Sequence, residues 1–357
     1  MATSNLSSPS LDIIPQYKIS SFQDIPKPRV YCSVCSIDKR IFVIGGCDSK
    51  GKSLNTTFVY SESCNWEIWP KIPRNRSAST LVLTNNSIFL IGGVDENQNA
   101  IIEVDSLNFV SQIWRTDFSL PVGVVGCGAF LYDNKIFVVA GATTDNISQR
   151  FFGYFDILNC LWVNLPDIPT ARYAMSTYVY DDFLYVIGGR DVLKPMVEIE
   201  AFDLKQSIWK TLPSIPSRRA YSCTLGYKKY IYHIGGVSEG VGTWKPNVRK
   251  LCERFDISTS QWVKLKPLKY RRTDFAACII MDKVIVAGGV SEQNDQLVPI
   301  SDAELYSYEK DKWESIVSLS IPRCSISCCS YLAGMLIIGG MGPGGPQKKV
   351  EFIQISS

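Results

Sequence analysis

Arginine recurs at a fixed place along this chain, and arginine is well suited to binding carboxylates and phosphates. Six arginines each stand 16 residues before a Gly-Gly pair: Arg29, Arg76, Arg172, Arg219, Arg272 and Arg323. A guanidinium group offers N–H donors in a planar fork, which fits a carboxylate or phosphate at two points. If these side chains converge on one cavity, they form a site for an acidic partner. In the alternative interpretation, each arginine donates to backbone carbonyls of adjacent turns, and the residues alone leave both open.

Residues suited to metal or catalytic chemistry are sparse. His233 is the only histidine, which excludes multi-histidine metal sites and paired acid and base histidines. Cys32 and Cys35 have the spacing of half a zinc or redox site, but they fall in an expected strand, where residues three apart face opposite sides. The cysteines are therefore expected to be structural. Without a nucleophile motif or a phosphate-binding loop, we expect no catalytic residue, cofactor or metal ion.

Composition indicates a folded, soluble protein. Of 357 residues, 46% are hydrophobic and 20% are charged, which is enough to bury a large core and excludes disorder. The net charge of +3 is too small for a dedicated nucleic-acid binder, so we expect no nucleic-acid partner. The N-terminus has no signal-peptide pattern and no apolar run is long enough to span a membrane. We expect a cytoplasmic protein with reduced thiols and no membrane contact.

The elements that position the arginines come from an internal repeat. Apolar runs end in Gly-Gly at intervals of about 50 residues, and one degenerate copy has Ala140-Gly141. A Trp follows in six of the seven copies: Trp66, Trp114, Trp162, Trp209, Trp262 and Trp313. Each copy contains short runs rich in Val, Ile, Tyr and Phe separated by turn residues, as in YAMSTYVY, FLYVIGG, VEIEAFDL and SIWKTL. Four antiparallel strands per copy, seven times over, predict an all-β, seven-bladed β-propeller.

The two ends of the chain are expected to close the ring. The last copy supplies three strands, and residues 19–26 align with residues 162–169, so the N-terminal strand should complete the seventh blade. Such pairing removes an exposed sheet edge. We expect residues 1–16 to form a flexible tail and residues 17–357 to form the propeller, with no additional domain.

Over about residues 17–357, the repeated pattern resembles the kelch repeat. The pattern consists of the Gly-Gly pair, an aromatic residue such as Tyr306 or Phe255, the Trp that follows it, and Pro-x-x-Arg. The stretches VYCS, RRTDFAACIIMDKVIVAGG and PRCSISCCS are most similar to the animal group called kelch domain-containing protein 8. The resemblance implies a kelch β-propeller used for recognition, as in cullin ubiquitin-ligase adaptors, actin-bundling proteins and polarity scaffolds. In the ligase adaptors, arginines of this column grip acidic peptides, and Pro73-Arg74-Asn75-Arg76 resembles such a stretch.

Two longer excursions, at 237–247 and 290–299, are further candidate binding elements because departures from a repeat often carry function. The first contains Trp244 and Lys245, and an exposed Trp is a common interface anchor. We expect a monomeric, non-catalytic protein-binding scaffold or adaptor that uses the arginine column, Trp244 and Lys245. Association with actin is one alternative, and an enzyme with dispersed active-site residues is an alternative of another class.

Overall fold

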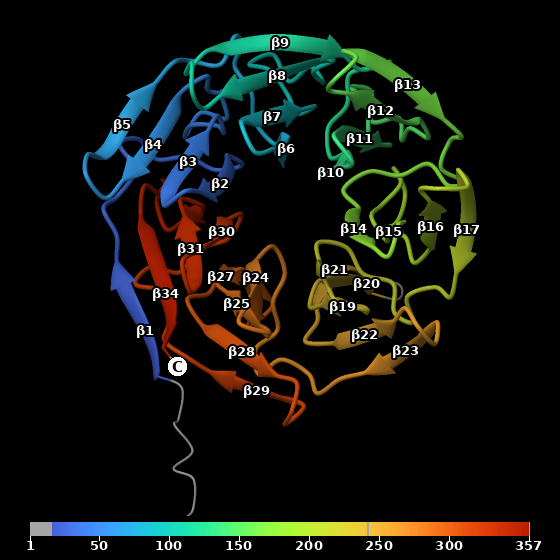
Figure 1. Ribbon diagram of the computed structural model, residues 1–357. Coiled ribbons are helices and arrows are strands. Elements are labelled where there is room, and N and C mark those ends of the chain that lie inside the picture. The colour runs from blue at the N-terminus through green and yellow to red at the C-terminus, as the bar shows by residue number, and fades with distance from the viewer. Residues whose placement is uncertain (1–15, 241–242, 357) are drawn as a thin grey trace, which may run out of the picture.

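The computed structural model describes residues 16–240 and 243–356, and for residues 16, 239, 240, 243–246 and 356 it describes the backbone alone. These residues contain no helix, and they form seven four-stranded antiparallel sheets. The sheets are arranged as blades around a common axis, as Figure 1 shows. The predicted all-β, seven-bladed propeller is confirmed.

The first strand of each blade lies nearest to the axis and the fourth lies outermost (Figure 1). Blade 1 consists of β2 (Ser33–Ile37), β3 (Arg40–Ile44), β4 (Thr57–Ser61) and β5 (Asn65–Trp69). Blade 2 consists of β6 (Thr80–Leu83), β7 (Ser87–Ile91), β8 (Glu103–Asn108) and β9 (Trp114–Ser119). Blade 3 consists of β10 (Gly128–Tyr132), β11 (Lys135–Val139), β12 (Phe152–Asp156) and β13 (Leu161–Leu165). Blade 4 consists of β14 (Ser176–Tyr180), β15 (Phe183–Ile187), β16 (Ile199–Asp203) and β17 (Ile208–Leu212).

The remaining blades have the same order of strands in space. Blade 5 consists of β18 (Cys223–Tyr227), β19 (Tyr230–Ile234), β22 (Cys252–Asp256) and β23 (Gln261–Lys264). Blade 6 consists of β24 (Ala276–Ile280), β25 (Lys283–Ala287), β28 (Ala303–Ser307) and β29 (Lys312–Ser315). Blade 7 consists of β30 (Ser327–Tyr331), β31 (Gly334–Ile338), β34 (Val350–Ser356) and β1 (Gln16–Ser21).

The N-terminal strand closes the ring as predicted. β1 pairs antiparallel with β34, in a register that runs from Gln16 opposite Ser356 to Ser21 opposite Glu351. Ile19, which aligns with the repeated Trp, packs against the apolar cluster shared by blades 6 and 7. Residues 1–15 lie outside the described residues, so the flexible tail stays a prediction.

The Gly-Gly pair ends the second strand of a blade because the backbone there requires a conformation that a side chain disfavours. Gly45 and Gly46 have φ of 62° and 89°, and a Cβ on Gly46 would lie 2.7 Å from the carbonyl oxygen of Val30. Glycine alone accommodates both the left-handed region and this close approach. The pair thus brings the end of each second strand against the segment that enters its own blade.

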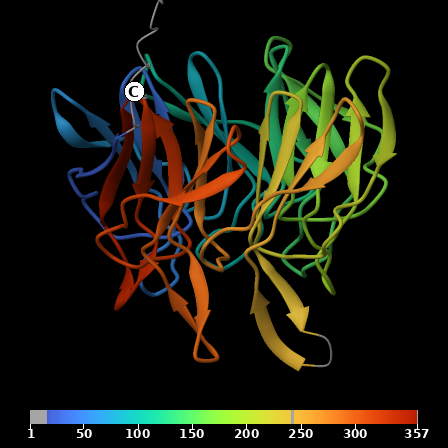
Figure 2. The same ribbon diagram turned by 90° about the horizontal axis from the view of Figure 1, so that it is seen from below.

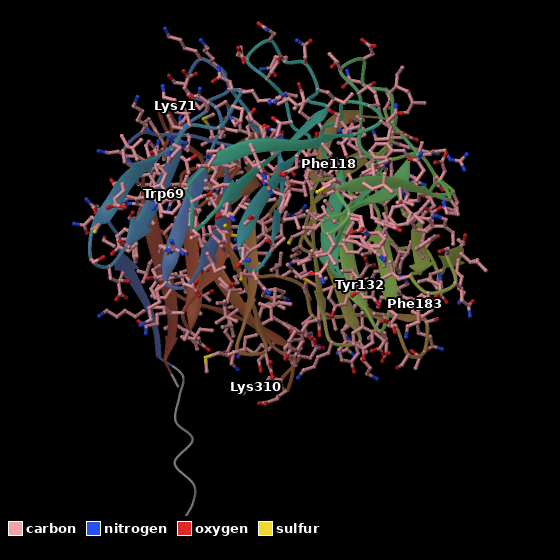
Figure 3. The ribbon with its side chains drawn as sticks, turned by 45° about the horizontal axis from the view of Figure 1, so that its top comes forward. Trp69, Lys71, Phe118, Tyr132, Phe183 and Lys310 are labelled. Atoms are coloured by element: carbon pink, nitrogen blue, oxygen red, sulfur yellow. The ribbon has the colours of Figure 1, made fainter. Side chains whose placement is uncertain are left out.

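Apolar side chains fill the spaces between neighbouring blades, as Figure 3 shows with Trp69 and Phe118 labelled. Trp69 of blade 1 lies in a buried cluster with residues of blade 2, and Phe118 of blade 2 stacks on Phe155 of blade 3 with ring centroids 4.0 Å apart. Most of the repeated tryptophans also donate their indole N–H to a backbone carbonyl of the preceding blade. The carbonyl acceptors are Gln23, Pro70, Pro166, Pro213 and Lys266.

The propeller has two different faces. The segments that enter the first strands and the connections after the Gly-Gly pairs lie on one face, which we call the mouth face. Three connections there form hairpins: β20 (Val237–Gly240) with β21 (Thr243–Val248), β26 (Val290–Gln293) with β27 (Gln296–Pro299), and β32 (Met341–Gly342) with β33 (Gly345–Pro346). Figure 2 shows the first two, gold and orange, projecting from the mouth face, whereas β34 ends at the opposite face. The two predicted excursions are these hairpins.

Candidate binding site at the mouth of the propeller

The six column arginines lie inside the molecule. The most exposed of them, Arg219, is only 2% exposed. In each, Nη1 donates to the carbonyl of the first glycine of the Gly-Gly pair, at 2.7 to 3.1 Å. In five of them, Nη2 binds a buried carboxylate on the third strand of the blade: Asp105, Glu200, Glu253, Glu304 and Glu351. Each guanidinium group therefore ties the second and third strands of a blade to the segment that enters it.

This placement corrects the expectation that the column rings an open mouth. The guanidinium groups are desolvated and already paired within the chain, so they do not form an open ring for a partner, although Arg219 also lines a pocket between blades 4 and 5. Burial lowers the pKa of Arg76 to about 10, and the Asp105 carboxylate opposes that shift. The arrangement matches the structural interpretation of the column, in which arginine donates to backbone carbonyls of adjacent segments.

A pattern in the sequence also indicates which residues bind these arginines. A carboxylate stands nine residues before the Trp in blades 2, 4, 5 and 6. Blade 3, which has Val124 in place of the arginine, has Gly153 at that position, and blade 1 has Thr57. Arg29 in blade 1 accordingly binds the hydroxyl of neighbouring Thr56 at 3.0 Å and lies over the ring of Phe58. Arginine and carboxylate occur together, which is typical of an internal ion pair.

The mouth itself is formed by the residue two positions after each column residue. All seven of these residues have a positive φ, between 48° and 63°: Tyr31, Ala78, Gly126, Ala174, Tyr221, Asp274 and Ser325. We call them the mouth ring. Several are joined from blade to blade by backbone hydrogen bonds, such as Ala174 N–H to Gly126 C=O at 2.8 Å. A bulky residue at positive φ is rare and is held there by the surrounding structure.

The mouth ring is unequal around its circumference. Blades 2, 3 and 4 contribute Ala78, Gly126 and Ala174, whereas the other four blades contribute tyrosines, a carboxylic acid and a hydroxyl. Tyr31 is 52% exposed and Tyr221 is 60% exposed. Exposed aromatic side chains held by a rigid backbone are typical of recognition surfaces.

A pocket of about 70 Å³ opens beside Tyr221, between blades 4 and 5. Its polar lining is Ser176, Arg190, Arg219, Tyr221, Ser222, Thr224 and His233. Arg190 lies between the rings of Tyr173 and Tyr221, 5.6 and 5.8 Å from their centroids, and its Nη1 donates to the Tyr221 hydroxyl at 2.8 Å. Among the residues that the structure describes, none forms an ion pair with Arg190. We call this site the Arg190 pocket.

The interior of the Arg190 pocket is rich in hydrogen-bond donors. His233 is 3% exposed, its Nδ1 lies 3.0 Å from Thr224 Oγ1, and its Nε2 has no hydrogen-bond partner. Burial, with the nearby charge of Arg219, lowers the pKa of His233 well below its usual range, so the ring is neutral at pH 7. The Nε of Arg219 also lacks a partner. With the hydroxyls of Ser176, Ser222 and Thr224 and no carboxylate in its lining, this pocket suits an acceptor or anionic group.

Arg190 and Tyr221 are not among the binding residues predicted from the sequence, although the repeat marks both as unusual. Arg190 directly follows a Gly-Gly pair, where the other copies have Cys47, Val94, Ala142, Val237, Val290 and Met341. Arg190 is the only charged residue at that position of the repeat. Tyr221 is one of only two aromatic residues in the mouth ring.

The remaining predictions concern Trp244, Lys245, a metal site and a membrane-spanning segment. Trp244 and Lys245 belong to β21, and their side chains lie outside the part of the chain that the structure describes, so their role stays a prediction. Among the described residues, no group of three or more His, Cys, Asp or Glu side chains is placed to hold a metal ion. Within the same residues, no helix has the length and apolarity needed to cross a membrane.

Comparison with known proteins agrees with this architecture. A family model described as the KLHDC2/KLHL20/DRC7 Kelch-repeats domain matches residues 61–236 and 112–289, and a Kelch motif model matches residues 28–67 and 271–320. The chain belongs to the kelch-repeat family. Kelch-repeat propellers are typically protein-interaction or substrate-adaptor modules.

Curated kelch proteins are related at low identity. The chain is 27% identical to alpha-scruin of Limulus polyphemus over 189 residues, which covers 49% of this chain and 20% of that protein. It is 23% identical to Kelch-like protein 40 of Xenopus tropicalis over 213 residues, covering 58% and 34%. It is 22% identical to Kelch-like protein terF of Aspergillus terreus over 332 residues, covering 88% and 61%. The matches thus span between a fifth and about three fifths of these relatives.

Proposed function

We propose that this kelch protein is a non-catalytic interaction module that binds a segment of a partner protein on its mouth face. An acidic side chain of that segment enters the Arg190 pocket. The observation that carries the proposal is a cation that has no ion pair among the described residues and lines a pocket together with two nitrogens that have no partner there, Nε2 of His233 and Nε of Arg219. A carboxylate would supply the acceptor that these groups lack.

The size of the Arg190 pocket supports a side chain as its occupant. Its volume of about 70 Å³ is far below the roughly 300 Å³ at which pockets for small-molecule ligands begin. A space of this size fits the end of one side chain, while the rest of the segment lies across the exposed rings of Tyr221 and Tyr31. Recognition of this kind needs no chemistry on the ligand, which is why the proposal is for a binding module and against an enzyme.

The proposal includes three narrower statements. The chain is placed with the kelch domain-containing protein 8 group on the strength of the stretches VYCS, RRTDFAACIIMDKVIVAGG and PRCSISCCS. It acts as a monomer in the cytoplasm, where thiols packed on inner strands stay reduced. Trp244 and Lys245, on the hairpin beside the Arg190 pocket, contribute to the same surface.

The test is affinity purification from cells with mass spectrometry, comparing the wild-type protein with Arg190→Gln. Arg115→Gln is the matched control, because Arg115 is a surface arginine that lies on outer strand β9. Thermal melting of all three proteins first establishes that they fold. We expect a set of partners to disappear from Arg190→Gln and to remain with Arg115→Gln. The same partner list from all three proteins would refute the Arg190 pocket as the recognition site.

A further inference from the structure

Asp274 is a mouth-ring carboxyl group that has no cationic partner among the described residues. Its Oδ2 accepts hydrogen bonds from the backbone N–H of Ser325 at 3.0 Å and from Ser325 Oγ–H at 2.5 Å. The ion pairs formed by described residues do not include Asp274. Burial raises the pKa of Asp274 because the charged carboxylate is partly desolvated, and the hydrogen bonds from Ser325 and from the Cys324 thiol oppose this shift. An anion of this kind is stabilised when a cation binds next to it.

Two mouth-ring tyrosines with exposed side chains lie on either side of Asp274 in the ring, one next to it and one beyond Ser325. Ser325 Oγ, which contacts Asp274, also lies 3.4 Å from the hydroxyl of Tyr31 in the next blade. On the other side, the carbonyl of Tyr221 accepts the backbone N–H of Asp274 at 3.3 Å and the hydroxyl of Thr273 at 3.0 Å. Asp274 therefore lies between two tyrosines that are each more than half exposed.

A carboxylate beside tyrosine rings is a suitable environment for an ammonium or guanidinium group. The ring faces attract cations through their quadrupole, and the carboxylate adds a charge-assisted hydrogen bond. The molecule already contains one example of the first contact, because the guanidinium of Arg190 lies 5.8 Å from the ring centroid of Tyr221. We call Tyr31, Tyr221, Asp274 and Ser325 the Asp274 subsite.

We propose that the Asp274 subsite binds a lysine or arginine side chain of the same partner segment whose acidic side chain enters the Arg190 pocket. This inference rests on the proposed function for the nature of the occupant, a peptide segment. The two sites have opposite charge, lie on neighbouring parts of the mouth face and meet at Tyr221. The segment that fits them has one acidic and one basic side chain at a set separation.

The opposite charges also predict which segments are rejected. A segment with acidic residues throughout would place a carboxylate next to Asp274, where like charges repel and neither is well solvated. A wholly basic segment would meet Arg190 in the same way. Selectivity between segments therefore comes from repulsion at the wrong subsite as well as attraction at the right one.

The experiment is selection from a displayed library of random 12-residue peptides with the wild-type protein, Asp274→Asn, Arg190→Gln and Asp145→Asn. Asp274→Asn removes the charge and keeps one side-chain oxygen that can accept from Ser325, while the other oxygen is replaced by an NH2 group. Asp145 is an exposed carboxylate in a mouth-face connection of blade 3, away from both subsites, and serves as the matched control. We expect peptides from the wild-type protein and Asp145→Asn to be enriched in one acidic and one basic residue at constant spacing.

The variants separate the inference from the proposed function. Asp274→Asn should lose the basic preference and keep the acidic one, and Arg190→Gln should do the reverse. A wild-type selection with acidic but no basic enrichment, or a basic enrichment that survives Asp274→Asn, overturns the Asp274 subsite and leaves the Arg190 pocket standing. A basic enrichment that depends on Asp274 without any acidic enrichment supports the subsite and refutes the acidic part of the proposed function. No enrichment of peptides at all counts against both.

A selected peptide then gives a quantitative test by fluorescence polarisation. Asp274→Asn should weaken binding of the peptide roughly 10-fold, the size expected for loss of one charge-assisted contact. The same substitution should leave the affinity unchanged when the basic residue of the peptide is replaced by glutamine. An equal loss for both peptides would mean that Asp274 acts on the shape of the mouth ring and would overturn the inference.

Discussion

At the scale of single residues, position in the repeat decides whether an arginine is structural or available. The column arginines are buried and bind carbonyls and carboxylates within the chain. Arg190 has the same side chain, but it lies on the mouth face and forms no ion pair with a described residue. The column arginine recurs in six of the seven blades, where it attaches the strands of its blade to one another. A residue that occurs once can serve recognition.

The ion pairs of the column predict an unequal response to mutation. Arg172→Met leaves Glu200 buried without its cation and should lower the free energy of unfolding by about 3 to 5 kcal/mol. Arg29→Met should cost less, because the partner of Arg29 is the hydroxyl of Thr56 and no carboxylate is left behind. Urea unfolding measures both.

The double variant Arg172→Met with Glu200→Met is the control for this prediction. The double variant should recover much of the lost free energy of unfolding, because replacing a buried ion pair with apolar residues is often neutral. Blade 3 already has Val124 at the arginine position and no carboxylate partner for it. If the double variant is as unstable as Arg172→Met alone, the loss comes from packing and the ion-pair explanation is wrong.

At the scale of the elements, β1 is the strand that closes the ring. It is the outer strand of blade 7, and its backbone pairs with β34 along all six of its residues. Beyond β1, the backbone N–H groups of Phe22 and Ile25 donate to the carbonyls of Val350 and Lys348 at 3.2 and 2.9 Å. The two ends of the chain thus form one sheet, and the ring has no open blade edge between blades 7 and 1.

Two truncations test this closure. Deleting residues 1–27 should cause unfolding or aggregation, because it removes β1 and exposes the edge of β34. Deleting residues 1–14 leaves β1 in place and should leave the melting temperature unchanged. Equal melting temperatures for the two truncated proteins would contradict the closure.

At the scale of the whole molecule, the inner strands bring cysteines from several blades to the region around the axis. Cys35, Cys223 and Cys328 lie on β2, β18 and β30 of blades 1, 5 and 7. Burial raises the pKa of each of these thiols to about 12. They behave as small apolar residues, which agrees with the expectation that they are structural.

This burial predicts a stability that falls at high pH. The folded state holds these thiols protonated, whereas in the unfolded chain they ionise near pH 8.5. Their contribution to stability is fully present below that pH and is lost as the pH rises towards 12. The melting temperature should therefore fall from pH 8 to pH 10, and replacing the three cysteines with alanine should flatten the fall. A melting temperature that is equally pH-dependent in both proteins would contradict this explanation.

The sequence by itself determined the architecture of this protein. The Gly-Gly pairs and the tryptophans recur at similar intervals because each blade has the same local requirements. The glycines allow the sharp end of a strand, and the Trp fills the gap to the neighbouring blade. Six Gly-Gly pairs and the degenerate Ala140-Gly141 predict seven blades, and the match of residues 19–26 to residues 162–169 predicts the closing strand. Such signals are visible because they are repeated.

Only the tertiary structure decided where the binding site lies. The column arginines turn inward because the carboxylates that bind them stand on another strand, about 30 residues later in the chain. Arg190 meets Tyr221 across a blade boundary, Asp274 meets Ser325 across a second, and Ser325 meets Tyr31 across a third. These contacts depend on positive φ values and on residues that are neighbours only after the ring has closed, so no spacing along the chain encodes them.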